Sequence, residues 1–167
     1  EHPFDAKITN RFYLFKDRGT GTPILDTDVF DATGAVGSNT YGYKITMAAG
    51  EKVVSSSVTV SGITYFNTNQ PSDTAGAGSC GSNLGIARQY SINFQDASAS
   101  NTTVVGTAVS ARASVYPGGG YLPSPVPVVV SLNGKNYVGV VSGTSVQTPP
   151  APALDIRSRT FWFIDSN

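Results

Sequence analysis

VTVSGITYF, the stretch from Val58 to Phe66, is the part of the sequence that most directly decides the fold. It places a two-residue Ser61-Gly62 turn signal between two runs rich in β-branched and aromatic residues. Such residues favour strands, and a short turn containing Gly joins neighbouring antiparallel strands. The stretch therefore predicts a tight β-hairpin.

A second stretch, Val128–Val138, repeats this arrangement around Asn133-Gly134. Asn-Gly between strand-forming runs is the strongest short-range hairpin signal. In both stretches small residues lead into the first strand, and a Gly-x-x-Tyr pattern follows at the turn. A third strand with aromatic residues is expected after each hairpin, at Tyr90–Phe94 and at Phe161–Phe163. Units that recur in this way are typical of β-propeller blades, so we favour a propeller over the alternative of a β-sandwich.

The rest of the chain also favours strands. No window sustains the apolar spacing of a helix, and Gly or Pro interrupts most long segments, so little helix is expected. Turn-forming composition predicts loops at Gln70–Gly85 and Tyr116–Pro125, and an extended, Pro-containing connector at Thr144–Leu154. The chain is thus predicted to be all-β. The predicted strands are Arg11–Phe15, Tyr41–Met47, Lys52–Val60, Gly62–Asn67, Ile86–Phe94, Thr102–Ser110, Val126–Leu132, Asn136–Ser142 and Ser158–Ile164.

Composition excludes several classes of function. The 167 residues include 11 basic and 11 acidic side chains, a formal net charge of zero, so the chain lacks the basic surface that nucleic acids or anionic membranes require. The apolar runs are far shorter than the ~20 residues that cross a bilayer, so no membrane insertion is expected. Only 13% of the residues are charged, and 18 Gly and 10 Pro are present. This composition favours an exported β-protein over a cytosolic enzyme.

The start of the chain and its single cysteine bear on processing. The sequence begins EHPF, with neither a basic region nor an apolar leader, so we expect a signal peptide to be either absent or already removed, and the start to be an internal cut. Cys80 is the only cysteine, which excludes a disulfide within the chain. We interpret it as an inert buried thiol, with a bond to another chain as the alternative.

Six segments, taken in their order and spacing, point to a family. They are Ile8–Tyr13 (ITNRFY), Gly50–Val54 (GEKVV), Gly62–Pro71 (GITYFNTNQP), Ser79–Tyr90 (SCGSNLGIARQY), Gly119–Val126 (GGYLPSPV) and Arg159–Phe163 (RTFWF). Together they resemble the C-terminal propeller domain of the PilY family, large proteins at the tip of bacterial type IV pili that act in pilus biogenesis and adhesion. The resemblance runs nearly from end to end of the chain.

The resemblance implies a division of the chain into blades. Residues 1–47 would be the end of a preceding blade with an insertion around Leu25–Ala35, residues 48–116 one blade, and residues 117–167 the last blade. It also implies an extracellular location, at the cell surface or pilus tip, with the remaining propeller blades, other protein chains and minor pilins of the tip as partners. Some family members carry an Asp-rich calcium loop, which lies outside the matched region, so no cofactor is expected here.

Two short patterns could bind ligands, and for each we favour a simpler interpretation. GAGSCG at Gly76–Gly81 fits the dinucleotide fingerprint as a string, but a strand is predicted after it where the fingerprint requires a helix, so we interpret it as a Gly-rich loop. Asp26, Asp28 and Asp31 bring three carboxylates together. Their spacing differs from that of a calcium loop, which needs ligands at positions 1, 3 and 5 and Gly at position 6. We interpret them as a solvated acidic turn.

No catalytic constellation stands out. His2 is the only histidine, so neither a Ser-His-Asp triad nor a multi-histidine metal site can form within the chain. A pair of carboxylates could hydrolyse glycosides, but nothing in the sequence brings Asp96, Asp155 or Asp165 opposite one another. No catalytic, cofactor-binding or metal-binding residue is therefore assigned, and the chain is expected not to be an enzyme.

Aromatic and basic residues on two predicted strands are expected to serve packing. Phe161 and Phe163 share one face of a strand and Trp162 takes the other, which favours packing between blades over a ligand platform. Arg88 beside Tyr90 is interpreted as a contact at the edge of a blade, in preference to an anion site. An enzyme of the quinone-dependent propeller type is disfavoured, since nothing in the sequence supplies its metal and cofactor ligands.

Two functions remain open. The first is a non-enzymatic, extracellular segment of a PilY-like protein, in which loops on a rigid β-scaffold act in pilus biogenesis and surface adhesion. The alternative is a structural subunit of an extracellular β-rich assembly, joined to other chains through open sheet edges.

Nine strands make roughly two blades and cannot close a propeller of about 4–8 blades. We therefore expect further β-blades or copies of the chain to cover exposed apolar surface. This surface is expected to include some of Tyr65, Phe66, Tyr90, Phe94, Phe161 and Trp162.

Overall fold

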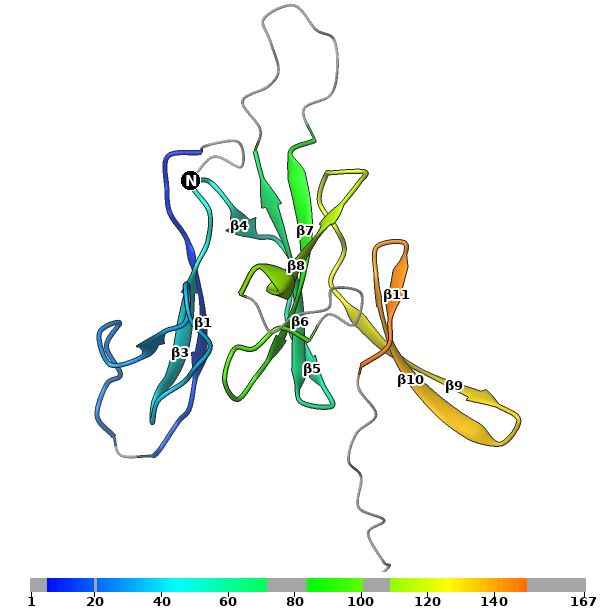
Figure 1. The fold of residues 1–167 in the computed structure, drawn as a ribbon, viewed down its shortest axis with the longest axis horizontal. Helices are drawn as coiled ribbons and strands as arrows, with labels where there is room; N and C mark the ends of the chain where they lie inside the picture. Colours follow the sequence, from blue (N-terminus) through cyan, green and yellow to red (C-terminus); the bar gives the residue numbers. More distant parts are fainter. Residues whose placement is uncertain (1–5, 20, 72–83, 101–108, 150–167) are drawn as a thin grey trace, which may run out of the picture.

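The computed structural model describes residues 6–19, 21–71, 84–100 and 109–149. Strands hold 46% of this part of the chain and helix 3%, so the all-β prediction is confirmed. The strands form three sheets, named A, B and C in chain order, and Figure 1 shows them side by side. None of the three closes into a barrel, and blades of a propeller are not established by this arrangement.

Sheet A comes from the first part of the chain and has the strand order β1-β3-β2. β1 and β3 are antiparallel, whereas β2 runs parallel to β3. Because side chains alternate between the two faces of a strand, Phe12 and Leu14 point into the core, and Arg11 and Tyr13 point away from it. The strands are β1 (Arg11–Phe15), β2 (Phe30–Asp31) and β3 (Gly42–Thr46).

Sheet B holds the middle of the chain and is antiparallel throughout. Its strands follow the order β4-β6-β7-β8, and β5 pairs with the same strand as β4, namely β6. A short 3-10 helix, η1, leads into β8. The elements are β4 (Lys52–Val53), β5 (Val58–Val60), β6 (Ile63–Gln70), β7 (Ile86–Asn93), η1 (Val109–Arg112) and β8 (Ala113–Tyr116).

Sheet C is an antiparallel sheet of order β11-β10-β9. It contains one of the two predicted hairpins, β9-β10, and sheet B contains the other, β5-β6. Both central residues of each turn have positive φ, 51° and 83° at Ser61-Gly62 and 51° and 74° at Asn133-Gly134. Turns of this kind match the twist of the strands they join, and both predicted hairpins are confirmed. The strands are β9 (Val126–Leu132), β10 (Lys135–Ser142) and β11 (Ser145–Gln147).

Sheet B lies between the other two sheets, so β6 is buried on both faces. Toward sheet A, Phe66 stacks between Phe12, at a centroid distance of 4.1 Å, and Tyr90, at 4.8 Å. Toward sheet C, Tyr65 packs in a smaller apolar cluster with Val140. The core between A and B is formed by Ala32, Tyr43, Ile45, Met47, Phe66, Ile92 and Ala97.

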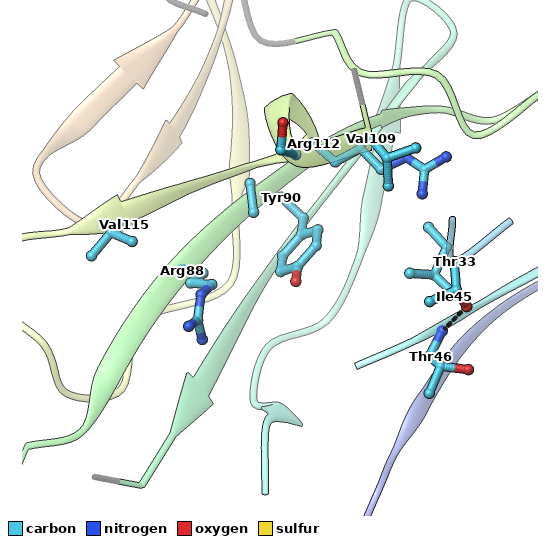
Figure 2. A pocket seen from close by; sticks show the side chains of 10 residues that line it. Thr33, Ile45, Thr46, Arg88, Tyr90, Val109, Arg112 and Val115 are labelled. Carbon is cyan, nitrogen blue, oxygen red and sulfur yellow. Dashed lines mark hydrogen bonds between the residues drawn. The ribbon is translucent and has the colours of Figure 1, made fainter. Parts of the chain in front are cut away.

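Arg112 ties η1 to loops of both sheet A and sheet B. Its side chain donates to three backbone carbonyls: Nε to Ala97 at 2.6 Å, Nη1 to Ala32 at 2.6 Å, and Nη2 to Ala35 at 2.7 Å. Figure 2 shows the guanidinium pointing from η1 toward the strands of sheet A. Arg112 is 2% exposed, and burial lowers its pKa from the usual range. Hydrogen bonds to the carbonyls offset the cost of burying the charge.

Sheets B and C are joined by hydrogen bonds as well as by apolar contact. Asn67 Nδ2 donates to Ser142 Oγ at 2.8 Å, and Ser142 Oγ donates in turn to Asn67 Oδ1 at 3.0 Å. Gln89 Nε2 donates to the carbonyl of Ser142 at 2.8 Å. These side chains come from β6, β7 and β10 and are buried. Buried hydrogen bonds therefore hold sheets B and C together in addition to the apolar contact.

The predicted strand Lys52–Val60 is interrupted in the structure. β4 and β5 are separate, and between them Ser55 Oγ accepts a hydrogen bond from the backbone N–H of Asn67 at 2.7 Å. A serine side chain here takes the place of a backbone acceptor in the ladder, which local side-chain hydrogen bonds commonly do. One continuous strand was therefore the wrong prediction for this stretch.

Three short elements also depart from the predictions. The described end of the predicted strand Thr102–Ser110 lies in η1, and β8 begins only at Ala113. β11 occupies part of the predicted connector Thr144–Leu154, because it pairs with β10 across a two-residue turn. β2 was not predicted, and its two residues pair with β3. The predicted strand Ser158–Ile164 lies outside the described residues.

Candidate functional site

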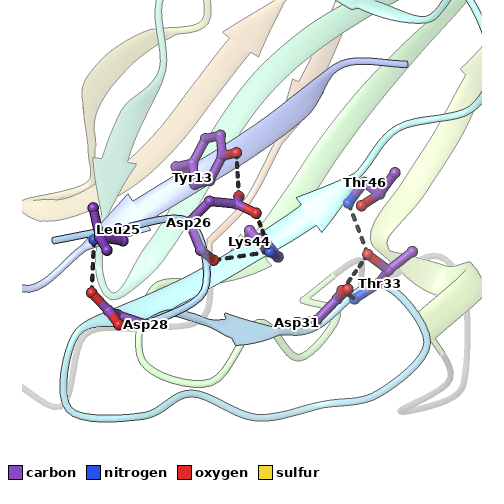
Figure 3. Close-up of polar contacts among 8 residues, drawn as sticks. All are labelled: Tyr13, Leu25, Asp26, Asp28, Asp31, Thr33, Lys44 and Thr46. Carbon is purple, nitrogen blue, oxygen red and sulfur yellow. Dashed lines mark hydrogen bonds and ion pairs between the residues drawn. The ribbon is translucent and has the colours of Figure 1, made fainter.

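The stack of three sheets has two outer faces, and the face of sheet A carries the acidic residues singled out in the sequence (Figure 3). Asp26 Oδ2 lies 2.7 Å from Lys44 Nζ, and Asp26 Oδ1 accepts a hydrogen bond from the Tyr13 hydroxyl at 2.6 Å. The hydrogen bond from Lys44, followed by that from Tyr13, lowers the pKa of the Asp26 carboxyl. Asp26 is therefore part of an exposed ion pair that belongs to sheet A itself.

The other two carboxylates bind local backbone groups. Asp28 Oδ2 accepts from the N–H of Leu25 at 2.8 Å. Asp31 Oδ1 accepts from both the N–H and the hydroxyl of Thr33, at 3.0 and 2.6 Å, and these bonds lower its pKa. In the described part of the chain, no group of three His, Cys, Asp or Glu side chains could hold a metal ion. The three aspartates thus have separate partners within the chain.

The outer face of sheet C has a different character. We use this name for the side chains of sheet C that point away from sheet B. The strand register puts Val126 beside Val141 and Val141 beside Val146, on the side opposite Val140, which packs against sheet B. The apolar side chains of the outer face of sheet C are Val126, Val128, Val130, Leu132, Tyr137, Val141 and Val146, and Lys135 lies on the same face opposite Leu132.

Most of the outer face of sheet C is open to solvent. The exposed fractions reach 67% at Val146, 57% at Leu132 and 52% at Tyr137. Figure 1 shows the β9-β10 hairpin extending away from sheet B, so the opposite face of its far half is uncovered as well, with Val129 66% exposed. Single exposed apolar residues are ordinary, but a contiguous apolar patch on a sheet marks an interaction site.

Arg88 and Tyr90 lie in the interface between sheets A and B, where both contact a buried carboxylate. Glu51 is 1% exposed, and its Oε1 accepts from Thr68 Oγ1 at 2.5 Å and from the Tyr90 hydroxyl at 3.1 Å. Arg88 Nη1 lies 3.6 Å from the same oxygen. Burial, and then the charge of Glu51, raise the pKa of Tyr90. Sequence reasoning did not single out Glu51, because a Glu at the start of a strand is normally exposed.

The remaining candidates contribute little to a site. Asp96 Oδ1 accepts from the N–H of Ser98 at 2.9 Å. In the described part of the chain, no helix is long and apolar enough to span a membrane.

Comparisons with protein-family models, curated proteins and solved structures found no match. The candidates that lie outside the described residues are His2, Gly76–Gly81 with Cys80, Asp155, Phe161–Phe163 and Asp165.

Proposed function

We propose that the chain is a non-enzymatic, extracellular segment of a PilY-like protein at the pilus tip, and that it acts in pilus biogenesis and surface adhesion. In this proposal the outer face of sheet C is the surface that packs against a further β-blade or another protein chain. The observation that carries the joining role is the exposed apolar patch at one end of the stack. The assignment to pili rests on the six sequence segments that resemble the PilY family.

The character of the patch favours a β-sheet as its partner. Within the stack, sheet B covers sheet A by apolar side chains from alternate strand positions. Sheet C covers the other face of sheet B by a smaller apolar cluster together with hydrogen bonds. The outer face of sheet C has a similar make-up of Val, Leu and Tyr at alternate positions. Burial of apolar surface stabilises such contacts by roughly 25 cal/mol per Å². A partner that presents a comparable sheet face would fit it.

The alternative, a structural subunit joined through sheet edges, has weaker support. β9 is an edge strand of sheet C and contains Pro127. Proline has no N–H to donate and is one of the devices that keep edge strands from pairing. The edge at β11 is only three residues long. Attachment through the face of sheet C is therefore favoured over attachment through its edges.

The expected partners follow from this proposal. They are remaining propeller blades or other β-rich chains at the face of sheet C, and minor pilins where the assembly meets the pilus. Nucleic acid, membrane lipid and a bound cofactor are not part of it. The acidic residues of sheet A hold their own neighbours and are not assigned to calcium.

The proposal can be tested in the bacterium that encodes the chain. Removing the coding region should reduce both the number of surface pili and attachment to surfaces. A double substitution, Val130→Lys with Leu132→Lys, should do the same by placing charge on the outer face of sheet C. Leu25→Lys, at an equally exposed apolar residue on sheet A's side of the chain, serves as the matched control and should leave both unchanged.

Immunoblots should show equal amounts of the control and the double variant, so that loss of protein is not mistaken for loss of function. Normal piliation and attachment after deletion would contradict the pilus assignment. Loss after deletion together with full function of the double variant would retain the pilus role and contradict the role of the face.

A further inference from the structure

A cavity of about 330 Å³ opens where sheet B extends past the end of sheet A. One wall comes from β7 and β8, through Arg88, Tyr90 and Val115, and the opposite wall from Ile45 and Thr46 at the end of β3. Figure 2 shows the Arg88 guanidinium and the Tyr90 ring pointing in the same direction from β7. Val115 is 63% exposed, so the cavity is open to solvent on this side.

Arg88 brings unused hydrogen-bonding capacity to this cavity. Its Nη1 is buried, yet it donates no hydrogen bond to any of the described residues. The nearest acceptor, Glu51 Oε1, is 3.6 Å away and already receives hydrogen bonds from Thr68 and Tyr90. Buried polar groups in native proteins nearly always have a partner, and one without calls for an explanation. A ligand that draws the Arg88 guanidinium a short way into the cavity would supply that partner.

The charge around the cavity favours an anion. Among the described residues that line it, the two with charge are Arg88 and Arg112. Glu51 balances Arg88 from behind, whereas the partners that hold Arg112 are neutral carbonyls. Arg112 therefore adds net positive charge without free donors, whereas Arg88, whose charge Glu51 balances, adds the donor. A guanidinium pairs best with a planar carboxylate, which it can bind with two parallel hydrogen bonds.

The remaining walls limit what the anion is attached to. Ile45, Val109 and Val115 are apolar, and Thr46 and Ser110 offer single hydroxyls. The volume is near the lower end for small-molecule sites, which fits a small ligand or one side chain of a larger one. We propose that this cavity binds a carboxylate carried on a short apolar chain, with the carboxylate at Arg88 and the chain against Ile45 and Val115.

Two sources could provide such a group: a free carboxylic acid, or a Glu side chain in a peptide segment. Isothermal titration of the purified chain distinguishes them, with butyrate and benzoate in one arm and the capped peptide Val-Glu-Val in the other. Butyramide, benzamide and the capped peptide Val-Gln-Val are the uncharged controls. We expect saturable binding of the carboxylate in at least one arm, about tenfold or more tighter than its amide.

Two variants place the binding in the cavity. Arg88→Lys keeps the charge beside Glu51 but loses the guanidinium fork, and it should weaken carboxylate binding about tenfold or more. Val115→Trp fills the open side from an exposed position and should also abolish binding. Val146→Trp, a matched change at a residue 67% exposed on sheet C, should leave it unchanged. Circular dichroism and thermal melts on all three variants check that they fold.

The proposal fails if neither arm shows saturable binding at millimolar concentrations, or if amides bind as well as carboxylates. It also fails if folded Val115→Trp binds as the unmodified chain does. Binding of the free acids alone would identify a small-molecule site, and binding of the Glu peptide alone a peptide site; both support the carboxylate assignment. The inference does not depend on the proposed pilus function.

Discussion

The two faces of sheet B are covered by neighbouring sheets in different ways. Toward sheet A, the interface has a seven-residue apolar core, a three-ring aromatic stack and the Arg112 cross-link. Toward sheet C, it has three core residues, Ile63, Tyr65 and Val140, and a hydrogen-bonded group around Ser142. The comparison indicates that sheets A and B form the stable body of the described chain, whereas sheet C is held more weakly and leaves an apolar face uncovered.

The largest loss of stability is expected when the interface between sheets A and B is disrupted. Phe66 is completely buried and stacks on two rings, so Phe66→Ala should lower the free energy of unfolding by about 3–5 kcal/mol. Urea denaturation followed by circular dichroism measures the change. Phe15→Ala is the control, because Phe15 is 53% exposed on the outer face of sheet A and should cost about 1 kcal/mol or less. Equal losses in the two variants would contradict the core assignment.

Arg112→Met should produce the next largest loss, about 2–4 kcal/mol. The change leaves the carbonyls of Ala32, Ala35 and Ala97 without this donor in a buried interface, while the volume of the side chain is roughly kept. Arg112→Lys should recover part of the loss, since it restores a charge and one or two donors. If Arg112→Met is as stable as the unmodified chain, the cross-link does not hold sheets A and B together.

A smaller loss is expected on the side toward sheet C. Ser142→Ala removes the two hydrogen bonds shared with Asn67 and should cost about 1–2 kcal/mol. The same urea titration applies, and Ser131→Ala on the exposed part of β9 is the control. A loss for Ser142→Ala larger than that for Phe66→Ala would reverse the order of the two interfaces.

The smallest expected change in the free energy of unfolding occurs at alkaline pH. Burial raises the pKa of Tyr65 to about 12, while the pKa of an unfolded tyrosine is about 10. The folded chain therefore holds the Tyr65 proton more tightly than the unfolded chain does. This difference adds to the free energy of unfolding in full below pH 10, and the added stability is lost as the pH rises from 10 toward 12. Burial also raises the pKa values of Tyr43 and Tyr90 in the interface between sheets A and B, so these residues add to the loss of stability at alkaline pH.

Replacing Tyr65 by Phe isolates the part of this trend that belongs to the side toward sheet C. The free energy of unfolding, measured at several pH values between 9 and 12, should fall less steeply for Tyr65→Phe than for the unmodified chain. Identical slopes would show that the Tyr65 hydroxyl titrates alike in the folded and unfolded chain.

Local patterns in the sequence predicted much of the fold. The bounds of β1 and β9 agree with the predicted Arg11–Phe15 and Val126–Leu132, and both hairpins form at the Gly-containing turns. These features depend on residue type and on neighbours in sequence, which a single sequence contains. β8 and β11 were missed because they are short and exist through pairing with β7 and β10.

The buried polar residues were beyond such patterns. Arg112 binds carbonyls 77 and 80 positions away in the chain, and nothing near it in the sequence marks it as buried. Glu51 and Arg88 likewise meet only when β7 lies against β6 and sheet A. The expected edge contact of Arg88 thus became an interior one beside a cavity. The expected exposed aromatic surface was wrong at Tyr65 and Phe66, which are buried between the sheets, and the exposed apolar residues lie on sheet C instead.

The central claim is that the outer face of sheet C is a joining surface, and light scattering coupled to size-exclusion chromatography tests it most directly. Protein purified without denaturant should associate as its concentration rises and should bind a dye that reports exposed apolar surface. Val130→Lys with Leu132→Lys should abolish both, whereas Leu25→Lys should abolish neither. A monomer at every concentration that binds no dye, or association unchanged in the double variant, would contradict the account.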